Sequence, residues 1–157
     1  MTIKNRPEYD KFISRIQKSS DSFRKASAEK RHSKEFRTAR ENLDHLIDDD
    51  SFLEFGQFAV AAQRSRRDYE ELQDKTNADG IITGFCSINS KLVGEYEAKA
   101  AAIVYDYSVL AGTQGYFHHA KLDRICEQAN KFNLPIIIFT EGGGGRPGDI
   151  DVLTQIA

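Results

Sequence analysis

The sequence predicts a mixed α/β fold in which helices cross over a sheet. From residue 51 onward, apolar segments rich in branched residues alternate with segments of helical periodicity, which is typical of a sheet covered by crossover helices. Two of the intervening turns contain several glycines, which indicates places where the backbone approaches another group closely. A chain of 157 residues is long enough for one domain with a hydrophobic core.

The N-terminal part is predicted to be helical and basic. Residues 11–40 contain ten lysines and arginines against three acids. Such a stretch fits contact with nucleic acid or another anionic surface, or else a solvated helix packed on a neighbouring element or chain. No aromatic stacking platform or DNA-binding motif accompanies it, so packing is favoured. We take residues 1–35 as an N-terminal basic helical segment and residues 36–157 as the domain that follows.

The first part of the domain is predicted to contain a helix, two strands and a polar excursion. Apolar residues recur at helical spacing over residues 36–47, and a short strand is expected at 51–56. Residues 61–79 are mostly polar, so we interpret them as a mobile surface excursion. Branched residues at 81–88 predict the next strand.

The second part of the domain is predicted to run strand, helix, strand. A helix-prone piece at 95–102 precedes an apolar strand at 101–107. After a glycine-bearing turn, apolar residues at helical spacing predict a helix over 117–132, with Lys121 on its solvent side. The four apolar residues 136–139 predict a short buried strand.

The most informative segment is the glycine loop, residues 142–148, which follows that last strand. Four consecutive glycines are costly to order, because glycine loses more conformational freedom on folding than any other residue. An ordered loop of this kind is expected where backbone N–H groups approach a ligand, near a helix N-terminus that favours negative charge. We expect Asp149 to cap that helix. A flexible surface linker is the alternative.

Two common phosphate-binding motifs fit this loop poorly. A P-loop needs a lysine and a hydroxyl after its last glycine, and Asp149 follows Gly148 instead. Gly143, Gly145 and Gly148 formally match the dinucleotide fingerprint. That match carries little weight, because any glycine-rich run generates it and the fingerprint normally opens on the first strand of its unit.

Side chains with catalytic potential are scattered along the sequence. His118 and His119 are adjacent on a helix and point about 100° apart, so one packed and one surface residue are expected rather than a metal site. Asp106 and Glu141 lie at predicted strand ends, a position that is compatible with either a catalytic or a structural capping role. What remains is backbone chemistry. Amides at a glycine-rich turn can hold an oxyanion, and removing one such donor typically costs about 3 kcal/mol of barrier.

Four segments in order resemble the N-terminal half of the carboxyltransferase (beta) subunit or domain of biotin-dependent acyl-CoA carboxylases. They are ARENLDHLIDDDSFLEFG (39–56), ADGIITGFCSIN (78–89), YDYSVLAGTQGYFHHAKLDRICEQA (105–129) and NLPIIIFTEGGGGRPGDID (133–151). The resemblance implies a crotonase-like (ClpP/crotonase) fold of ββα repeats, present here as a truncated N-terminal half preceded by helices. The implied reaction transfers a carboxyl group from carboxybiotin to the α-carbon of an acyl-CoA through an oxyanion-stabilised enolate.

The resemblance also implies site residues. Gly143 and Gly144 fall on the glycine pair whose amides stabilise the oxyanion. The substrate-binding or CoA-binding positions that it implies are Gly112, Thr113, Gly115, Lys121 and Arg146. The family pattern at the loop is Ser-Gly-Gly-Ala-Arg, so Gly142 and Gly145 replace its serine and alanine.

Partners and cofactors follow from the same resemblance. Carboxybiotin on a carrier domain is expected as co-substrate, and no metal is expected in this half. Biotin carboxylase and biotin carrier parts, with the C-terminal carboxyltransferase half of a second subunit, would complete the site in a homo-oligomer. The chain breaks off two turns into a predicted helix, so we expect a fragment that is inactive alone. A biotin-dependent acyl-CoA decarboxylase of the same fold, or a non-catalytic module that uses the basic helix, are the alternatives.

The cysteines and the N-terminus bear on location. Cys86 and Cys126 are isolated, which fits a reducing compartment. No apolar run approaches the roughly 18 residues that span a bilayer, and the N-terminus lacks the apolar core of a signal peptide. Cytoplasm is the predicted location, with an organelle matrix as the alternative, and neither nucleic acid nor a membrane is expected as a partner.

Overall fold

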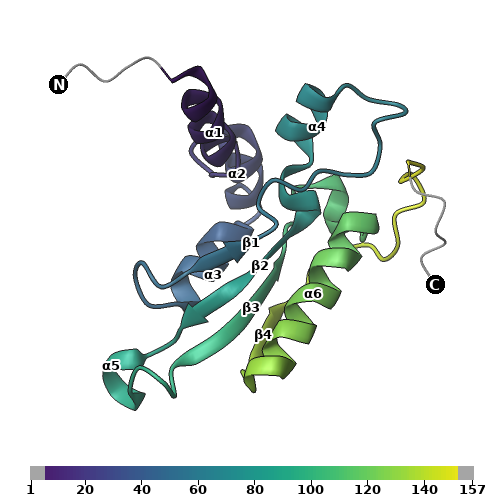
Figure 1. The fold of residues 1–157 in the computed structure, drawn as a ribbon. Coiled ribbons are helices and arrows are strands. Elements are labelled where there is room, and N and C mark those ends of the chain that lie inside the picture. The colour runs from purple at the N-terminus through teal and green to yellow at the C-terminus, as the bar shows by residue number, and fades with distance from the viewer. Residues whose placement is uncertain (1–5, 152–157) are drawn as a thin grey trace.

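The computed structural model describes residues 6–151, and a four-stranded sheet forms its centre (Figure 1). The strands lie in the order β1 (Leu53–Phe55), β2 (Ile81–Ser87), β3 (Lys99–Tyr105) and β4 (Ile136–Phe139). The first two pairings are antiparallel and β3 pairs with β4 in parallel. A parallel pair needs a crossover connection, which α6 (Tyr116–Phe132) supplies. The predicted α/β architecture is therefore confirmed.

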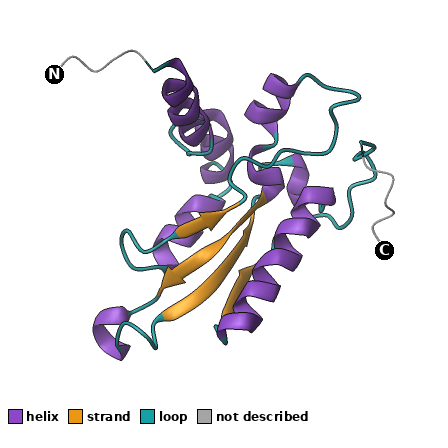
Figure 2. Cartoon of the chain, in the orientation of Figure 1, coloured by secondary structure: helices purple, strands orange, loops and turns teal. Residues whose placement is uncertain are grey.

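Helices cover both faces of the sheet, with α3 (Ala39–Leu46) on one and α6 on the other (Figure 2). Because successive side chains of a strand point to opposite faces, β2 and β3 each contribute to two core clusters. The α3 cluster consists of Ala39, Leu43, Ile82, Cys86, Ala100, Ala102 and Val104, and the α6 cluster of Ile81, Ala101, Ile103, Tyr105, Ile125 and Ala129. Short alanine side chains on β3 let both helices approach the sheet closely.

The remaining helices gather at the two ends of the sheet. Figure 1 shows α1 (Pro7–Lys18), α2 (Lys25–His32) and α4 (Tyr69–Lys75) at the end toward which β3 runs, and α5 (Ser90–Val93) at the opposite end. The N-terminal segment, predicted to be helical throughout, is thus two helices joined by a turn. Within residues 6–151, no helix combines the length and the apolar character needed to cross a bilayer.

The prediction of a mobile surface excursion at 61–79 is wrong. This segment contains α4, and Ala61, Leu72 and Asp79 are fully buried in it. Apart from Asp79, its charged residues lie nearer the surface, and Arg67 pairs with Glu71 four residues further on, in α4. A few small or apolar residues at the right spacing are enough to pack the segment against the domain.

Two further predictions need correction. The helix-prone piece at 95–102 is not helical, because α5 ends at Val93 and β3 begins at Lys99, paired with Ser87 across the hairpin. The last strand, β4, is only half covered, with Ile136 39% and Ile138 48% exposed. Its position as the last strand of the sheet explains this exposure.

Candidate active site

The glycine loop lies beside the turn that follows β3. The amide of Gln114 donates to the carbonyl oxygen of Gly144 at 2.8 Å, and the amide of Arg146 donates to the carbonyl oxygen of Gln114 at 2.8 Å. These two bonds form a short parallel bridge between Gln114 and Gly145. Because β3 and β4 are parallel neighbours, the turns that follow them lie at the same end of the sheet, where both strands have their carboxyl ends. Both glycine-bearing turns therefore belong to one site.

Close packing explains two of the glycines. A Cβ atom on Gly112 would collide with the carbonyl oxygen of Glu141, and one on Gly142 would collide with the carbonyl oxygen of Gly112. These residues let the two turns touch, so their contribution to the site is geometric. Any side chain at either position would push the glycine loop away from the turn.

Gly143 and Gly144 differ from these two, because a Cβ atom on either would collide with no backbone atom. Both are exposed, and a Cβ atom on Gly144 would meet nothing within 4 Å. The φ of Gly144 is +81°, a left-handed value that side chains disfavour. Among residues 6–151, neither amide donates a hydrogen bond to a protein acceptor. The two predicted oxyanion donors are thus open to a ligand.

Arg146 is buried beneath the loop. Its side chain is 5% exposed, and Nη1 pairs with Asp79 and lies 3.4 Å from Oδ2 of Asp149. Nε donates to Oγ1 of Thr113 at 3.2 Å and Nη2 to the carbonyl oxygen of Thr113 at 2.6 Å. Gly115 leaves room for this pair, because a Cβ atom there would collide with both Arg146 and Asp149. Arg146 therefore joins the two turns from within the protein.

The same two carboxylates also hold the N-terminus of α6. Oδ2 of Asp79 accepts from the amide of His118, and Oδ2 of Asp149 accepts from the amide of Tyr116, at 2.8 and 2.9 Å. Carboxylates at these first-turn amides are favoured by the helix dipole. Burial raises the pKa of Asp79, and the Arg146 guanidinium opposes that rise. Asp149 had been predicted to cap a helix that follows it, but residues 149–151 are not helical and its carboxylate caps α6 instead. The part of the predicted helix after residue 151 lies outside the described residues.

Lys121 had been predicted on the solvent side of its helix, but the structure places it in the core. Its ammonium donates to the carbonyl oxygens of Ala78, at 2.9 Å, and Ile81. Its alkyl chain fills the space that a side chain on Gly56 would need. Helical spacing explains the burial, because Lys121 lies one turn before the buried Ile125.

Replacing Lys121 by methionine is expected to remove a pH dependence of stability. Burial lowers the pKa of Lys121 from 10.5 to about 7. Between these values the unfolded chain binds a proton that the folded chain lacks, so stability rises with pH by up to about 1.4 kcal/mol per unit. The difference in unfolding free energy between wild type and Lys121→Met, from urea titrations across this range, should increase with pH. The exposed Lys131→Met is the control, and a constant difference for Lys121→Met would contradict the prediction.

The side chains of the two adjacent histidines lie in different environments. His118 is fully buried, its ring lies edge-on to Tyr105 with centroids 4.6 Å apart, and burial lowers its pKa to about 4. His119 is partly exposed, as expected for a packed residue beside a surface residue. Within the part of the chain that the structure describes, no cluster of three His, Cys, Asp or Glu residues is arranged to hold a metal.

The strand-end acids Asp106 and Glu141 pair with arginines of the N-terminal segment. Nη1 of Arg24 lies 2.8 Å from Oδ2 of Asp106, and Arg31 binds Glu141 through two hydrogen bonds of 2.7 Å. These pairs favour structural roles for both acids. They also account for part of the basic excess of residues 11–40, whose cations face acids of the same chain.

A cationic hollow of about 370 Å³ opens next to the glycine loop. Its lining residues are Ser27, Lys30, Arg31, Lys34, Tyr107, Ser108 and Ala111. The carbonyl oxygen of Ala111 lies 3.8 Å from the position of a Cβ atom on Gly143, so the hollow adjoins the loop. Among residues 6–151, Lys30 and Lys34 have no ion-pair partner. An anionic group could therefore bind there.

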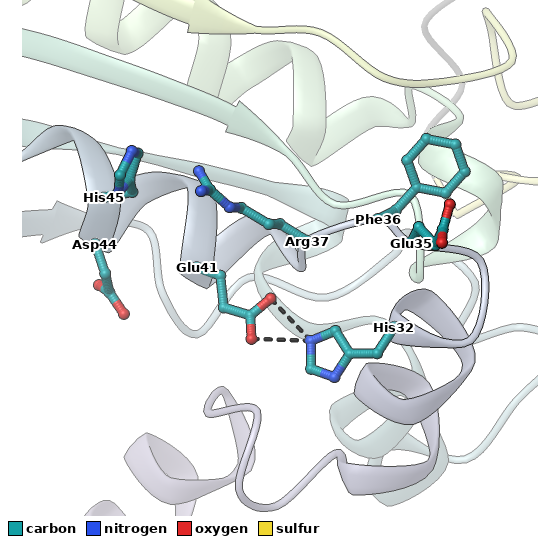
Figure 3. A pocket seen from close by; sticks show the side chains of 7 residues that line it. All are labelled: His32, Glu35, Phe36, Arg37, Glu41, Asp44 and His45. Atoms are coloured by element: carbon teal, nitrogen blue, oxygen red, sulfur yellow. Dashed lines mark hydrogen bonds and ion pairs between the residues drawn. The ribbon is translucent and has the colours of Figure 1, made fainter.

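A second hollow, of about 640 Å³, lies between α2 and α3 and contains none of the predicted site residues (Figure 3). Nε2 of His32 lies 2.9 Å from both carboxylate oxygens of Glu41. Glu41 also accepts from the amide of Thr38 in the capping box of α3. Figure 3 shows His45 at the far end of this hollow from His32. The ionic contacts in this hollow thus stabilise the start of α3, and they are not arranged around a common ligand position.

The carboxyl transferase domain family matches residues 30–154, and the chain belongs to that family. It is 34% identical over 115 residues to the acetyl-coenzyme A carboxylase carboxyl transferase subunit beta of Prochlorococcus marinus (strain MIT 9215). It is 31% identical over 118 residues to the methylmalonyl-CoA decarboxylase subunit alpha of Veillonella parvula. These alignments cover 68% and 75% of this chain but only 37% and 21% of the relatives. The chain thus spans about a fifth to somewhat over a third of the curated relatives.

Solved structures agree with this membership. A single-chain, multi-domain long-chain acyl-CoA carboxylase matches with a TM-score of 0.89 and 46% identity, over 93% of this chain and 15% of that one. The transcarboxylase 12S structure with methylmalonyl-coenzyme A bound matches with a TM-score of 0.69 and 26% identity, over 94% of this chain and 28% of that one. The predicted crotonase-like carboxyltransferase fold is confirmed.

Proposed function

We propose that this chain is part of the carboxyltransferase component of a biotin-dependent acyl-CoA carboxylase. The reaction places a carboxyl group, supplied by carboxybiotin, on the α-carbon of an acyl-CoA. The observation that carries the proposal is the pair of open amides at Gly143 and Gly144, on a loop that Arg146 fixes to the neighbouring turn. Family membership and the acyl-CoA enzymes among the relatives support it.

The proposed role of the two amides is to stabilise negative charge on oxygen. When an α-proton leaves an acyl thioester, charge develops on the thioester oxygen, and preorganised N–H donors lower the barrier because they need no reorganisation. Thr113 and Arg146 act through the loop, since their polar groups bond to each other. Gly112 and Gly115 act by leaving space, and Lys121 by supporting the turn that carries Ala78.

We propose that the cationic hollow receives phosphate groups of the CoA moiety. Lys30→Glu with Lys34→Glu should then raise KM for acyl-CoA about tenfold or more with a smaller change in kcat, because lost phosphate contacts weaken binding and each tenfold is about 1.4 kcal/mol. Lys91→Glu on α5, at the opposite end of the sheet, is the matched control. A KM equal to that of the control would contradict the assignment.

The overall proposal is tested with the full-length protein. It is combined with its biotin carboxylase and biotin carrier parts and with the C-terminal carboxyltransferase half of a second subunit. ATP-dependent incorporation of labelled bicarbonate into an acyl-CoA is the expected result. The decarboxylase is the second candidate, because one relative is a methylmalonyl-CoA decarboxylase subunit. Release of carbon dioxide from a carboxyacyl-CoA without any ATP-dependent carboxylation would favour it. If the protein shows neither activity with acyl-CoAs of several chain lengths, both proposals are contradicted.

A further inference from the structure

One contact from the N-terminal segment reaches the start of the glycine loop. Nη1 and Nη2 of Arg31, near the end of α2, each lie 2.7 Å from one carboxylate oxygen of Glu141. Glu141 is the residue directly before Gly142. A two-pronged arginine–carboxylate pair fixes orientation as well as distance, because both groups are planar. The Arg31–Glu141 pair therefore restrains the residue from which the loop begins.

The Arg31 guanidinium is itself held in place. Nε and Nη2 donate to the carbonyl oxygen of Arg37 at 3.1 and 3.0 Å. The ring centroids of Phe36 and Tyr107 lie 5.0 and 5.6 Å from its Cζ atom, within the range of cation–π attraction. Only 13% of the Arg31 side chain is exposed. The group that binds Glu141 is thus a fixed anchor and not a mobile surface charge.

The backbone of Glu141 is restrained as well. Its carbonyl oxygen packs against Gly112 so closely that no side chain fits there. Downstream, Arg146 fixes the end of the glycine run to Thr113. Gly143 and Gly144 therefore lie between two fixed points, one set by Arg31 and one by Arg146.

We propose that Arg31 and Glu141 are positioning residues, which hold the amides of Gly143 and Gly144 in the geometry that the oxyanion requires. This inference rests on the proposed function of those amides. A displacement of about 1 Å at a reacting centre can lower a rate by about 100-fold, and Glu141 is two residues from Gly143. Arg31 also lines the cationic hollow, but its guanidinium is taken up by Glu141 and by the carbonyl oxygen of Arg37. We therefore assign the phosphate contacts in the hollow to Lys30 and Lys34, and the Arg31–Glu141 pair acts through the loop.

A double-mutant cycle in the full-length protein tests the pair. Arg31→Gln and Glu141→Gln should each lower kcat about tenfold or more while KM changes less than about threefold. The double variant should lose no more than either single variant, because all three lack the same pair. Arg31→Lys should recover kcat only in part, since lysine cannot form the two-pronged contact. Additive losses, or a change in KM alone, would overturn the positioning role.

Arg40 and Glu54 supply a matched control. They form a similar two-pronged pair, at 2.7 and 3.0 Å, which joins α3 to β1 and does not contact the glycine loop. Arg40→Gln should lower stability about as much as Arg31→Gln but leave kcat near the wild-type value. An equal fall in kcat in both variants would show a general effect of destabilisation.

Backbone hydrogen exchange separates this inference from the proposed function. The amides of Gln114 and Arg146 bond across the two turns, and in Arg31→Gln they should exchange about tenfold faster than in Arg40→Gln. If that pattern holds while the wild-type protein transfers no carboxyl group, the restraint stands and the proposed function fails. Unchanged exchange in Arg31→Gln would overturn the restraint whatever the activity.

Discussion

Valine in place of Gly143 is expected to abolish carboxyl transfer in the full-length protein without unfolding it. The branched side chain would cover the exposed amide and stiffen the loop, and loss of one oxyanion donor lowers kcat by about 100-fold to 1000-fold. The fold should survive, because a Cβ atom at this position meets Cγ2 of Thr113 at 3.5 Å and the carbonyl oxygen of Ala111 at 3.8 Å, both ordinary contact distances. Steady-state transfer rates, with circular dichroism to verify folding, provide the measurement.

Gly145→Ala is the matched control for that experiment. A Cβ atom on Gly145 meets nothing within 4 Å, and alanine is the residue that the family pattern has there. The control should retain most of its activity. Gly144 is a poorer test, because its φ of +81° would add about 1–2 kcal/mol of backbone strain to any functional effect. Full activity in Gly143→Val would exclude that amide from the oxyanion site.

Removing the Arg146 side chain is expected to cause the largest loss of stability, about 3–5 kcal/mol for Arg146→Ala. The change leaves the carboxylates of Asp79 and Asp149, 0% and 1% exposed, without their common cation. Breaking a buried ion pair on one side is strongly destabilising, because the remaining charge stays out of water. It also removes both hydrogen bonds to Thr113. Urea titration of wild type and variant measures the difference.

Arg66→Ala controls for the loss of an arginine as such. Arg66 is exposed and donates one hydrogen bond, 2.8 Å long, to the carbonyl oxygen of Gly148. Its removal should change the free energy of unfolding by less than about 1 kcal/mol. If Arg146→Ala lost no more than this control, the buried cluster would not contribute to stability as described.

Local sequence patterns predicted the elements that depend on local information. Helical spacing and the glycine turn indicated α6, and branched runs indicated β2 and β4. The four glycines marked the loop correctly as a place where backbone is exposed. The open amides of Gly143 and Gly144 agree with that interpretation, although their chemical role stays a prediction.

The rest of the site depends on partners that are distant in the chain. Asp79 fell within the segment that was interpreted as a surface excursion, and its pairing with Arg146 spans 67 residues. No periodicity connects positions so far apart. Lys121 could have been recognised as buried, because it shares a helix face with Ile125 and Ala129, but its charge suggested a surface position. The rule that charges face solvent fails where backbone carbonyls are available to satisfy an ammonium group.

The pairing of Arg31 with Glu141 also bears on the order in which the protein forms. The two residues are 110 positions apart, and Arg24 and Asp106 are 82 apart. On a ribosome the N-terminal helices emerge first, yet Arg24 and Arg31 lack the acids that they pair with until β3 and β4 have been made. Contacts of such long sequence separation form late, because loop-closure entropy must be overcome first. We therefore expect the glycine loop to reach its final geometry late in folding, after both strands are in place.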